Sequence, residues 1–376
     1  MKIAFFTDTY YPAMDGVVRS VNSYKIELEK RGHEVKVFAP APAAREERRK
    51  GVVYADSISF WSYAQYRIPI NTSKCVAEAV KFKPDIVHSH AMVLMALAAK
   101  KAAKKCNAPL VGTYHTLLPK AGHYLSNIEG IQLWFENICW KYLRWLYGSF
   151  DLVFAPSEFM QKRIAKHGIK SEVMASPLDV KKFSPGKINS EVREWIGEKE
   201  GAVLFFGRVA KEKNIDFLID MVKTKTWQNW KAKLIIAGEG PYRGKLMERV
   251  EKEKLGEFVK FAGKIDEKLV PSFYRAALCT IFPSEFETQG LTALESMACG
   301  TPVVALRGTA LAEVVVPGKS GALCEKDAQN AVYAMQNAIK NRKKLGKRGR
   351  EIALKYSAEK CTDKLLEYYK REIGKR

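Results

Sequence analysis

Cysteine is scarce in this sequence, and the cysteines that occur are scattered. There are seven, and no two of them form a Cys-x-x-Cys pair. An odd number of isolated cysteines supports neither a disulfide framework nor a structural zinc site. We therefore expect a reducing compartment and no bound metal.

Long hydrophobic runs are also missing. No stretch reaches the roughly 20 consecutive apolar residues that a helix needs to cross a bilayer. The apolar run at 2–6 ends at Thr7 and Asp8, which is too short for the core of a signal peptide. We therefore expect a cytoplasmic protein that can meet a membrane only peripherally, on its inner face.

Acidic residues are too few to balance the basic ones. The 63 lysines and arginines exceed the 41 aspartates and glutamates and give a formal net charge of +22. Such a charge favours polyanionic partners, which include anionic lipids, phosphorylated small molecules and nucleic acid. The cations are dispersed over both halves and no nucleic-acid module is recognisable, so we expect no nucleic-acid partner and keep that function as a distant alternative.

Short apolar runs alternate with helical patterns twice along the chain, as in βαβ units with parallel sheets. The first half predicts strands at 2–6, 34–39, 85–88, 109–113 and 151–155, with helices near 18–31, 72–82, 92–105, 131–147 and 157–167. The second half predicts strands at 202–206, 233–237, 258–261, 278–282 and 302–305, with helices near 214–222, 243–253, 267–274, 290–299 and 328–341.

The turn-rich segment 175–186 separates the two alternations. We predict an α/β chain with two Rossmann-like domains, 1–178 and 179–356. A terminal helical segment, 357–376, is expected to pack back on the first domain. The charged, patternless stretch 43–51 is expected to be a mobile loop.

The most informative string runs from Phe282 to Ala305. A strand ends there, a polar loop carries Glu287, and Gly290 opens a helix that contains Glu295. A helix start offers free N–H groups and a positive dipole end to a diphosphate. Glu287 can reach sugar hydroxyls and Glu295 can accept both hydroxyls of a ribose. Taken alone, the two glutamates could equally be exposed acids at a helix end.

The whole string resembles the E-x7-E signature of the large retaining glycosyltransferase family of the GT-B fold. The resemblance implies two Rossmann-like domains facing across a cleft and a nucleotide-sugar co-substrate, with no cofactor and no metal. It assigns donor contacts to five residues in this string: Glu287, Gly290, Leu291, Thr292 and Glu295.

Further motifs extend the resemblance over nearly the whole chain. The loop 7–20 matches the family's glycine-containing loop, with Gly16 near the donor phosphate, although Asp15 stands where many members have a second glycine. After the strand at 202–206, Gly207, Arg208 and Lys213 match the residues that bind the departing diphosphate. The two cations would stabilise the charge that develops as the glycosidic bond breaks. In a chain this basic they could also be solvated surface cations.

Two more elements complete the predicted site. Ile265 lies in a strand-end glycine loop that matches the family's nucleotide lining. His115 follows an apolar strand and, by resemblance, contacts the transferred sugar or the acceptor. A histidine with an ordinary pKa near ~6.5 could also transfer a proton. Most of the other histidines are interpreted as structural, and His88 and His90 are expected to point to opposite faces of their strand.

The resemblance also bears on mechanism and acceptor. Retention by double displacement would require a carboxylate beside the anomeric carbon, and the family's equivalent of Glu287 is poorly placed for that. We expect same-face attack, in which the leaving phosphate, held by Arg208 and Lys213, helps to deprotonate the acceptor.

The strings at 16–18, 114–116 and 287–292 look most like diacylglycerol glucosyltransferases, so we expect UDP-glucose as donor and a lipid acceptor. A GDP-mannose-dependent enzyme acting on a phosphoinositol-type or soluble acceptor is the alternative. The aromatic helix 131–148, near the basic cluster at 100–105, fits either the protein core or an anionic membrane surface.

Overall fold

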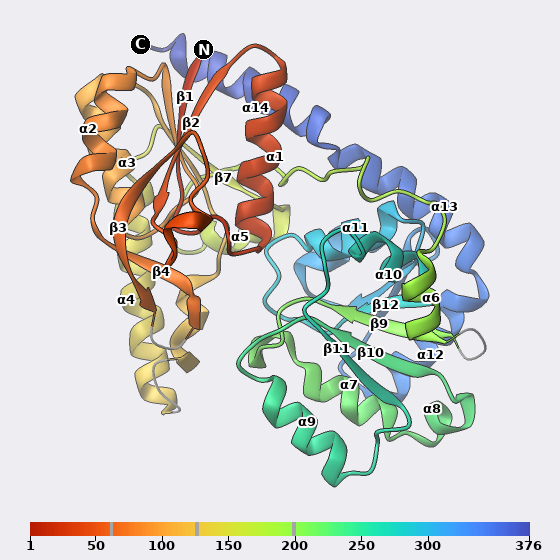
Figure 1. The fold of residues 1–376 in the computed structure, drawn as a ribbon. Helices are drawn as coiled ribbons and strands as arrows, with labels where there is room; N and C mark the ends of the chain where they lie inside the picture. The colour runs from red at the N-terminus through yellow and green to blue at the C-terminus, as the bar shows by residue number, and fades with distance from the viewer. Residues whose placement is uncertain (61–62, 125–127, 198–200) are drawn as a thin grey trace. The chain divides into compact units, whose positions relative to one another are not determined.

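The computed structural model describes residues 1–60, 63–124, 128–197 and 201–376. The chain divides into two compact units (Figure 1). Unit 1 comprises Met1–Pro177 together with Ala358–Arg376, and unit 2 comprises Leu178–Ser357. The C-terminal helix α14 (Ala358–Ile373) is therefore part of unit 1.

Unit 1 is built on an eight-stranded sheet of order β4-β3-β2-β1-β5-β6-β7-β8. The strands are β1 (Lys2–Phe6), β2 (Glu34–Pro40), β3 (Val52–Phe60), β4 (Tyr63–Asn71), β5 (Ile86–Ser89), β6 (Leu110–Thr113), β7 (Leu152–Ala155) and β8 (Glu172–Val173). All neighbouring pairs are parallel except β3 with β4. The strand order reverses between β1 and β5, and open α/β sheets bind ligands outside the carboxyl ends of the strands at such a point.

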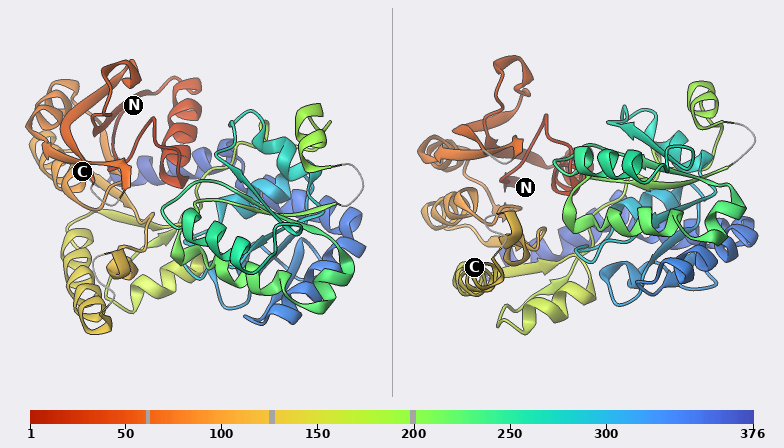
Figure 2. Two further views of the ribbon diagram at one scale, coloured as in Figure 1. Left: turned by 60° about the horizontal axis from the view of Figure 1, so that its bottom comes forward. Right: turned by 90° about the horizontal axis from the view of Figure 1, so that it is seen from below.

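Helices cover both faces of this sheet because β1 alternates its side chains between two cores. Ile3 and Phe5 join the core under α1 (Gly16–Lys30) and α14, whereas Ala4 and Phe6 join the core under α2 (Ser73–Phe82) and α3 (Leu94–Cys106). The remaining helices of unit 1 are α4 (Glu129–Tyr147) and α5 (Glu158–Ala165), and α4, yellow in Figures 1 and 2, lies at the margin of the unit.

The hairpin formed by β3 and β4 was not predicted from the sequence. The antiparallel pair adds two strands at the edge of the parallel sheet. The stretch 43–51, expected to be a mobile loop, contains a 3-10 turn at Arg45–Glu47. Arg49 also places its guanidinium 3.3 Å from the centre of the Tyr11 ring. This loop is therefore tied to the segment that follows β1.

Unit 2 contains a six-stranded parallel sheet of order β11-β10-β9-β12-β13-β14. The strands are β9 (Ala202–Phe206), β10 (Lys233–Ala237), β11 (Val259–Gly263), β12 (Cys279–Phe282), β13 (Val303–Leu306) and β14 (Gly321–Cys324). The helices are α6 (Ser190–Ile196), α7 (Ile215–Val222), α8 (Lys225–Trp230), α9 (Arg243–Lys252), α10 (Val270–Ala276), α11 (Leu291–Ala298), α12 (Ala328–Lys340) and α13 (Arg342–Ala353). The strand order reverses between β9 and β12, as it does between β1 and β5 in unit 1.

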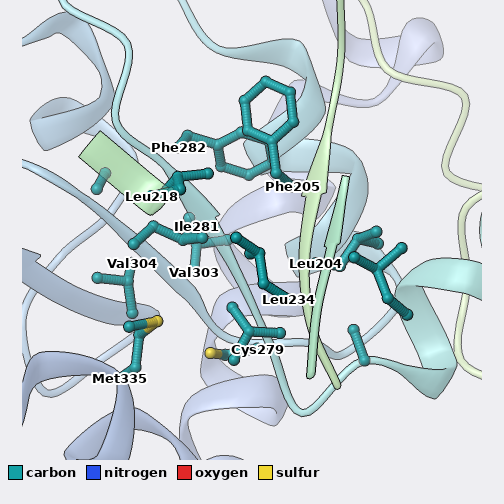
Figure 3. Close-up of a cluster of buried hydrophobic side chains, with 14 of the residues drawn as sticks. Leu204, Phe205, Leu218, Leu234, Cys279, Ile281, Phe282, Val303, Val304 and Met335 are labelled. Carbon is teal, nitrogen blue, oxygen red and sulfur yellow. The ribbon is translucent and has the colours of Figure 1, made fainter. Parts of the chain in front are cut away.

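The centre of unit 2 is a continuous apolar core between its sheet and its helices. Figure 3 shows side chains of β9, β10, β12 and β13 meeting Leu218 of α7 and Met335 of α12. Together with α8 and α9 these helices form one layer, and α10, α11 and α13 lie on the other side of the sheet (Figure 1). The predicted architecture of two parallel-sheet α/β domains is confirmed.

The cysteines of the described structure form no disulfide. All seven cysteines are free, and all but Cys106 are buried. Within the described residues, the structure contains no helix that combines the length and apolar character of a membrane span.

Candidate active site

The predicted donor residues of unit 2 gather at the carboxyl edge of its sheet, beside the reversal in strand order. Gly207 and Arg208 directly follow β9, and the loop that carries Glu287 follows β12. Because β9 and β12 are hydrogen-bonded parallel neighbours, the segments after them leave the sheet at the same edge. This placement puts the candidate residues where α/β folds bind ligands.

Lys213 and Glu287 connect these two segments. The Lys213 ammonium donates to Glu287 Oε1 at 2.6 Å, with only 20% and 16% of the two side chains exposed. Asn214, in a left-handed conformation at φ 54°, donates its side-chain amide to the carbonyl of Pro283 at 3.3 Å. The Lys213–Glu287 ion pair and the Asn214 hydrogen bond therefore fix the loop after β9 against the loop after β12.

Arg208 is the second cation at this edge. It forms an ion pair with Glu212, a nearly buried carboxylate one turn along, and keeps 36% of its own side chain exposed. Arg208 is thus oriented by the protein and still accessible to a ligand. Arg208 and Lys213 are half-buried, ion-paired groups. They are therefore not two fully solvated surface cations.

The start of α11 provides the backbone part of the site. Gly290 is the N-cap at φ +89°, and a Cβ atom there would lie 2.1 Å from Leu311 Cδ2. Only glycine fits this turn without strain. Leu291 and Thr292 are half-buried in the first turn. The first backbone N–H groups of a helix lack the usual partner four residues earlier, so this helix start can offer backbone donors beside the loop of Glu287.

Glu295 lies one turn further along α11 and is only 2% exposed. Its Oε2 accepts a hydrogen bond of 2.9 Å from the hydroxyl of Tyr274, a fully buried residue of α10. Tyr274 therefore restrains the carboxylate that the sequence assigns to the ribose. Sequence reasoning missed Tyr274 because it lies in a different helix, with no motif of its own.

Close backbone packing shapes the remainder of this edge. Gly238, which follows β10, has φ +134°, and a Cβ atom there would lie 1.9 Å from the carbonyl oxygen of Gly207. Ile265 follows β11, two strands from β9, and packs against the core of unit 2. Ile265 is therefore the predicted contact that lies furthest along the sheet.

Gly16 and His115 belong to unit 1. Gly16 is exposed and begins α1, where Asp15 acts as the N-cap by accepting from the backbone N–H of Val18 at 2.9 Å. The second Asp15 oxygen accepts from the Tyr66 hydroxyl at 3.2 Å. The residue that replaces the family's additional glycine thus caps a helix and contacts the β3–β4 hairpin.

His115 follows β6, two strands from β1, and is half-buried. Its Nε2 lies 2.9 Å from Nδ1 of His90. Burial lowers the pKa of His115 to about 4, so the prediction of an ordinary pKa near 6.5 was wrong. At neutral pH the His115 ring is therefore uncharged. It can form hydrogen bonds, but its pKa lies too far below neutral pH for it to act as a proton donor.

The expectation that His88 and His90 point to opposite faces was also wrong. Their rings stack with centroids 4.1 Å apart. Residues two apart on a strand share a face, because the side-chain period of a strand is two.

Across the described residues, no group of three or more His, Cys, Asp or Glu side chains is arranged to hold a metal ion.

Asp8 is a further half-buried group that the sequence did not single out. Its carboxylate accepts from the backbone N–H groups of Met92, Val93 and Met95 at 2.8, 3.0 and 3.3 Å. Burial raises the pKa of Asp8, and these three donors partly oppose the shift. Asp8 thereby ties the segment after β1 to the start of α3.

The aromatic helix α4 proves to have apolar residues on two opposite sides. Cys139, Trp140, Leu143, Leu146 and Tyr147 are buried. On the outer side, Ile131, Trp134, Ile138 and Trp145 are 42%, 65%, 43% and 57% exposed. Packing against the core therefore accounts for only half of the aromatic pattern.

Basic groups lie beside Trp145, near the C-terminal end of α4. Lys100 of α3 lies 4.6 Å from the centre of the Trp145 ring. A shallow surface hollow of about 440 Å³ is lined by Lys141, Arg144, Trp145, Gly148 and Ser149. The exposed Trp145 is thus bordered by positive charge.

Two parts of this chain match known families, one in each half. Residues 14–181 match the family described as Glycosyltransferase Family 4, and residues 188–353 match Glycosyl transferases group 1. The chain is 30% identical over 334 residues to the alpha-monoglucosyldiacylglycerol synthase of Streptococcus pneumoniae, covering 86% of this chain and 75% of that one. It is 25% identical to a GDP-mannose-dependent alpha-mannosyltransferase of Mycolicibacterium smegmatis, covering 100% of this chain and 99% of that one.

Solved structures agree with the fold. Sucrose-phosphate synthase from Thermosynechococcus elongatus aligns over 100% of both chains with a TM-score of 0.81 at 21% identity. HepE of Anabaena, solved with UDP-glucose, aligns over 99% of this chain and 100% of that one with a TM-score of 0.78 at 18% identity. The fold is that of the GT-B glycosyltransferases. The chain belongs to the group 1 and family 4 glycosyltransferases, which include glycolipid synthases and mannosyltransferases.

Proposed function

We propose that this glycosyltransferase moves a glucosyl group from UDP-glucose to a diacylglycerol-type lipid at a membrane surface, with retention of the anomeric configuration. The observation that carries the proposal is the Lys213–Glu287 contact of 2.6 Å beside the start of α11. The 30% identity to a protein named alpha-monoglucosyldiacylglycerol synthase supports the donor sugar and the acceptor.

The donor diphosphate would be bound by unit 2. The first N–H groups of α11 and its positive dipole end favour a phosphate group at Gly290. Arg208 and Lys213 add two cations at the same sheet edge. Because both already pair with carboxylates, they are held in place before the donor arrives. Preplaced charge stabilises the negative charge that grows on the leaving diphosphate.

The two glutamates would bind the other parts of the donor. Glu295 is buried and restrained by Tyr274, which suits a carboxylate that accepts both ribose hydroxyls. Glu287 lies on the loop before α11 and keeps 16% of its side chain exposed, which suits contact with sugar hydroxyls. Ile265, on the loop after β11, would line the nucleotide.

Transfer would proceed on one face of the sugar. The acceptor hydroxyl attacks the anomeric carbon as the bond to the phosphate oxygen breaks, and its proton passes to that phosphate. The products are UDP and the glycosylated lipid. An ion pair with Lys213 makes Glu287 a poor nucleophile for the double displacement that would otherwise explain retention. Neutral His115 would contact the sugar or the acceptor as a hydrogen-bonding group.

The outer side of α4 would contact the membrane. Trp134 and Trp145 place amphipathic rings on the surface, and Lys100, Lys141 and Arg144 lie near Trp145. Tryptophans with flanking cations favour the interface of anionic bilayers. A net charge of +22 would draw the protein to the same surface. We therefore propose peripheral binding to the cytoplasmic face.

The test is a donor and acceptor matrix. UDP-glucose, UDP-galactose and GDP-mannose are each incubated with vesicles of phosphatidylglycerol that contain either diacylglycerol or phosphatidylinositol. We expect a new glycolipid only with UDP-glucose and diacylglycerol, and NMR of its anomeric proton should report the α configuration. Product from GDP-mannose alone, or a β-linked product, would overturn the corresponding part of the proposal.

A GDP-mannose-dependent reaction is the second candidate. The similarity to the M. smegmatis mannosyltransferase spans 100% of this chain, whereas the similarity to the S. pneumoniae synthase spans 86%. The same matrix separates the two, since mannosylation of phosphatidylinositol or of a soluble acceptor would require GDP-mannose.

A further inference from the structure

Three histidine rings lie in a row at the carboxyl edge of the unit 1 sheet. His88 is the penultimate residue of β5, and its ring stacks on His90 at 4.1 Å and 29°. His90 in turn stacks on His115 at 5.1 Å and 26°. The row therefore ends at the residue that the proposed function places at the sugar or acceptor. His90 is the ring between His88 and His115.

The inner end of the row is fixed at both ring nitrogens. His88 Nδ1 lies 2.5 Å from the hydroxyl of Tyr369, and Nε2 lies 2.7 Å from the hydroxyl of Thr113. His88 and Tyr369 are fully buried. The C-terminal helix α14 thus contributes to the same buried group as β5 and β6.

His90 makes one polar contact through its ring, to His115. Its Nδ1 lies 2.9 Å from His115 Nε2. Its Nε2 is buried and has no hydrogen-bond partner within the described residues. The ring is 3% exposed, and burial together with the neighbouring histidines lowers its pKa well below 6.5. At neutral pH it is a neutral imidazole with one N–H group and one lone pair.

The position of that single proton follows from the cost of burial. A buried N–H group without an acceptor is rarer in proteins than an unsatisfied acceptor. The proton of His90 is therefore best placed on Nδ1, which has a partner, with the lone pair on the unpartnered Nε2. His90 then donates to His115 Nε2. Since His115 is neutral as well, its own proton must be on Nδ1.

We propose that His90 is a positioning residue that holds His115 in the Nδ1–H tautomer through this hydrogen bond and ring stacking. His115 then presents an N–H donor at Nδ1 and has no free lone pair to remove a proton from the acceptor. This inference rests on the proposed function only in that His115 is taken to contact the sugar or the acceptor. It agrees with a reaction in which the leaving phosphate takes the acceptor proton.

Two substitutions at His90 distinguish the effect of its hydrogen bond to His115 from the effect of losing the packed ring. In His90→Asn the amide occupies the place of Nδ1 and can still donate to His115. In His90→Gln the amide lies further out, near the place of Nε2, so the bond is lost. We expect kcat/KM for UDP-glucose with diacylglycerol vesicles to fall less than about threefold for His90→Asn and about tenfold for His90→Gln, as loss of one hydrogen bond implies.

A double-mutant cycle tests whether His90 acts through His115. In a His115→Ala background, His90→Gln should lower kcat/KM no further. An equal loss with and without His115 would overturn the positioning role. Thermal unfolding serves as the folding control for every variant, and calorimetry with UDP checks that unit 2, which carries the proposed nucleotide contacts, is unaffected. The donor that supports turnover in the matrix is used throughout.

NMR of the parent protein, labelled with 15N-histidine, tests the tautomer without any change in activity. We expect a protonated Nδ1 and an unprotonated Nε2 for His115, with the signals assigned by their loss in His115→Ala. A protonated Nε2 would overturn the inference even if turnover followed the expected pattern. Parental turnover in His115→Ala would instead contradict the proposed role of His115 and leave the tautomer result valid.

Discussion

In unit 2, the segments after β9 and β12 carry charged side chains that pair with one another, Lys213 with Glu287 at 2.6 Å. In unit 1, the segments after β5 and β6 carry histidines that stack as neutral rings, His90 with His115 at 5.1 Å. Both units reverse their strand order at the matching place in the sheet. The same scaffold therefore presents charge in one unit and neutral hydrogen-bonding groups in the other.

The contrast fits a division of labour within the proposed reaction. A diphosphate requires positive charge, and half-buried ion pairs keep cations ready for it. An acceptor hydroxyl requires oriented donors and acceptors, which neutral rings supply. All six histidines of the sequence lie before residue 178 and none in the span of unit 2. Substitutions or conditions that affect one unit and spare the other can test this division of labour.

The largest effect is expected from Arg208→Ala. We expect kcat to fall about 100- to 1000-fold, the range for removing one preplaced charge from a transition state. Affinity for UDP should change much less, because the charge that Arg208 meets grows during bond breaking. Steady-state kinetics and calorimetry measure the two quantities. Lys223→Ala is the matched control, since Lys223 is also ion-paired, to Glu253, and lies at the end of α7. An equal loss in binding and turnover would contradict the assigned role.

Substitutions of Glu295 and Glu287 should impair different steps of the reaction. Glu295→Ala removes an acceptor for two ribose hydroxyls, and we expect affinity for UDP to fall about 10- to 100-fold, as hydrogen bonds to charged groups imply. Glu287→Ala should chiefly lower turnover, since it acts on the sugar. Calorimetry with UDP distinguishes them. If both variants bound UDP like the parent, Glu295 would have no role in the nucleotide site.

A change confined to α4 should spare the chemistry of unit 2. We expect the double variant Trp134→Ala, Trp145→Ala to bind phosphatidylglycerol vesicles about tenfold more weakly, because two interfacial aromatic rings are lost. Calorimetry with UDP should give the parental affinity. Tyr333→Ala removes another aromatic side chain, 57% exposed and located in unit 2, and serves as the control. A loss of vesicle binding that is equal in Tyr333→Ala would contradict a specific role for α4.

The sequence predicted most regular elements and the α/β class because buried parallel strands form apolar runs of four or five residues, such as Ala202–Phe206. It missed β3 and β4, where polar residues such as Asp56, Ser57 and Ser59 interrupt the apolar pattern in an edge hairpin. Edge strands bury less apolar surface, and their pattern is correspondingly weaker. β8 was missed because it has only two residues, and β14 because it begins at a glycine and its four residues Gly321–Cys324 do not form a run of large apolar side chains.

Motifs located the candidate site better than they described its electrostatics. Glu287, Gly290 and Glu295 lie in one continuous string, so their proximity was predictable, whereas the Glu295 partner Tyr274 lies 21 residues earlier. The Lys213–Glu287 pair spans 74 residues, and only the shared sheet edge brings its two members together. The depressed pKa of His115 depends on burial, which a local motif does not encode.

The smallest effect is expected in the response to acid. Burial lowers the pKa of His115 to about 4 and the pKa values of His88 and His90 well below 6.5. The unfolded chain, with histidines near ~6.5, therefore binds more protons than the folded chain, so stability rises with pH. The stability contributed by the neutral histidines should be lost as the pH falls from about 6.5 toward 4. The raised pKa of Asp8 offsets part of this loss.

Hydrogen exchange followed by mass spectrometry can compare the two units directly. After correction for intrinsic exchange, peptides from β5 and β6 should open more readily at pH 5 than at pH 7, whereas peptides from β9 and β12 should change little. The expected difference corresponds to a shift of several degrees in the unfolding temperature of unit 1. A parallel loss of protection in both units would show that buried histidines do not set the acid response, since unit 2 contains none.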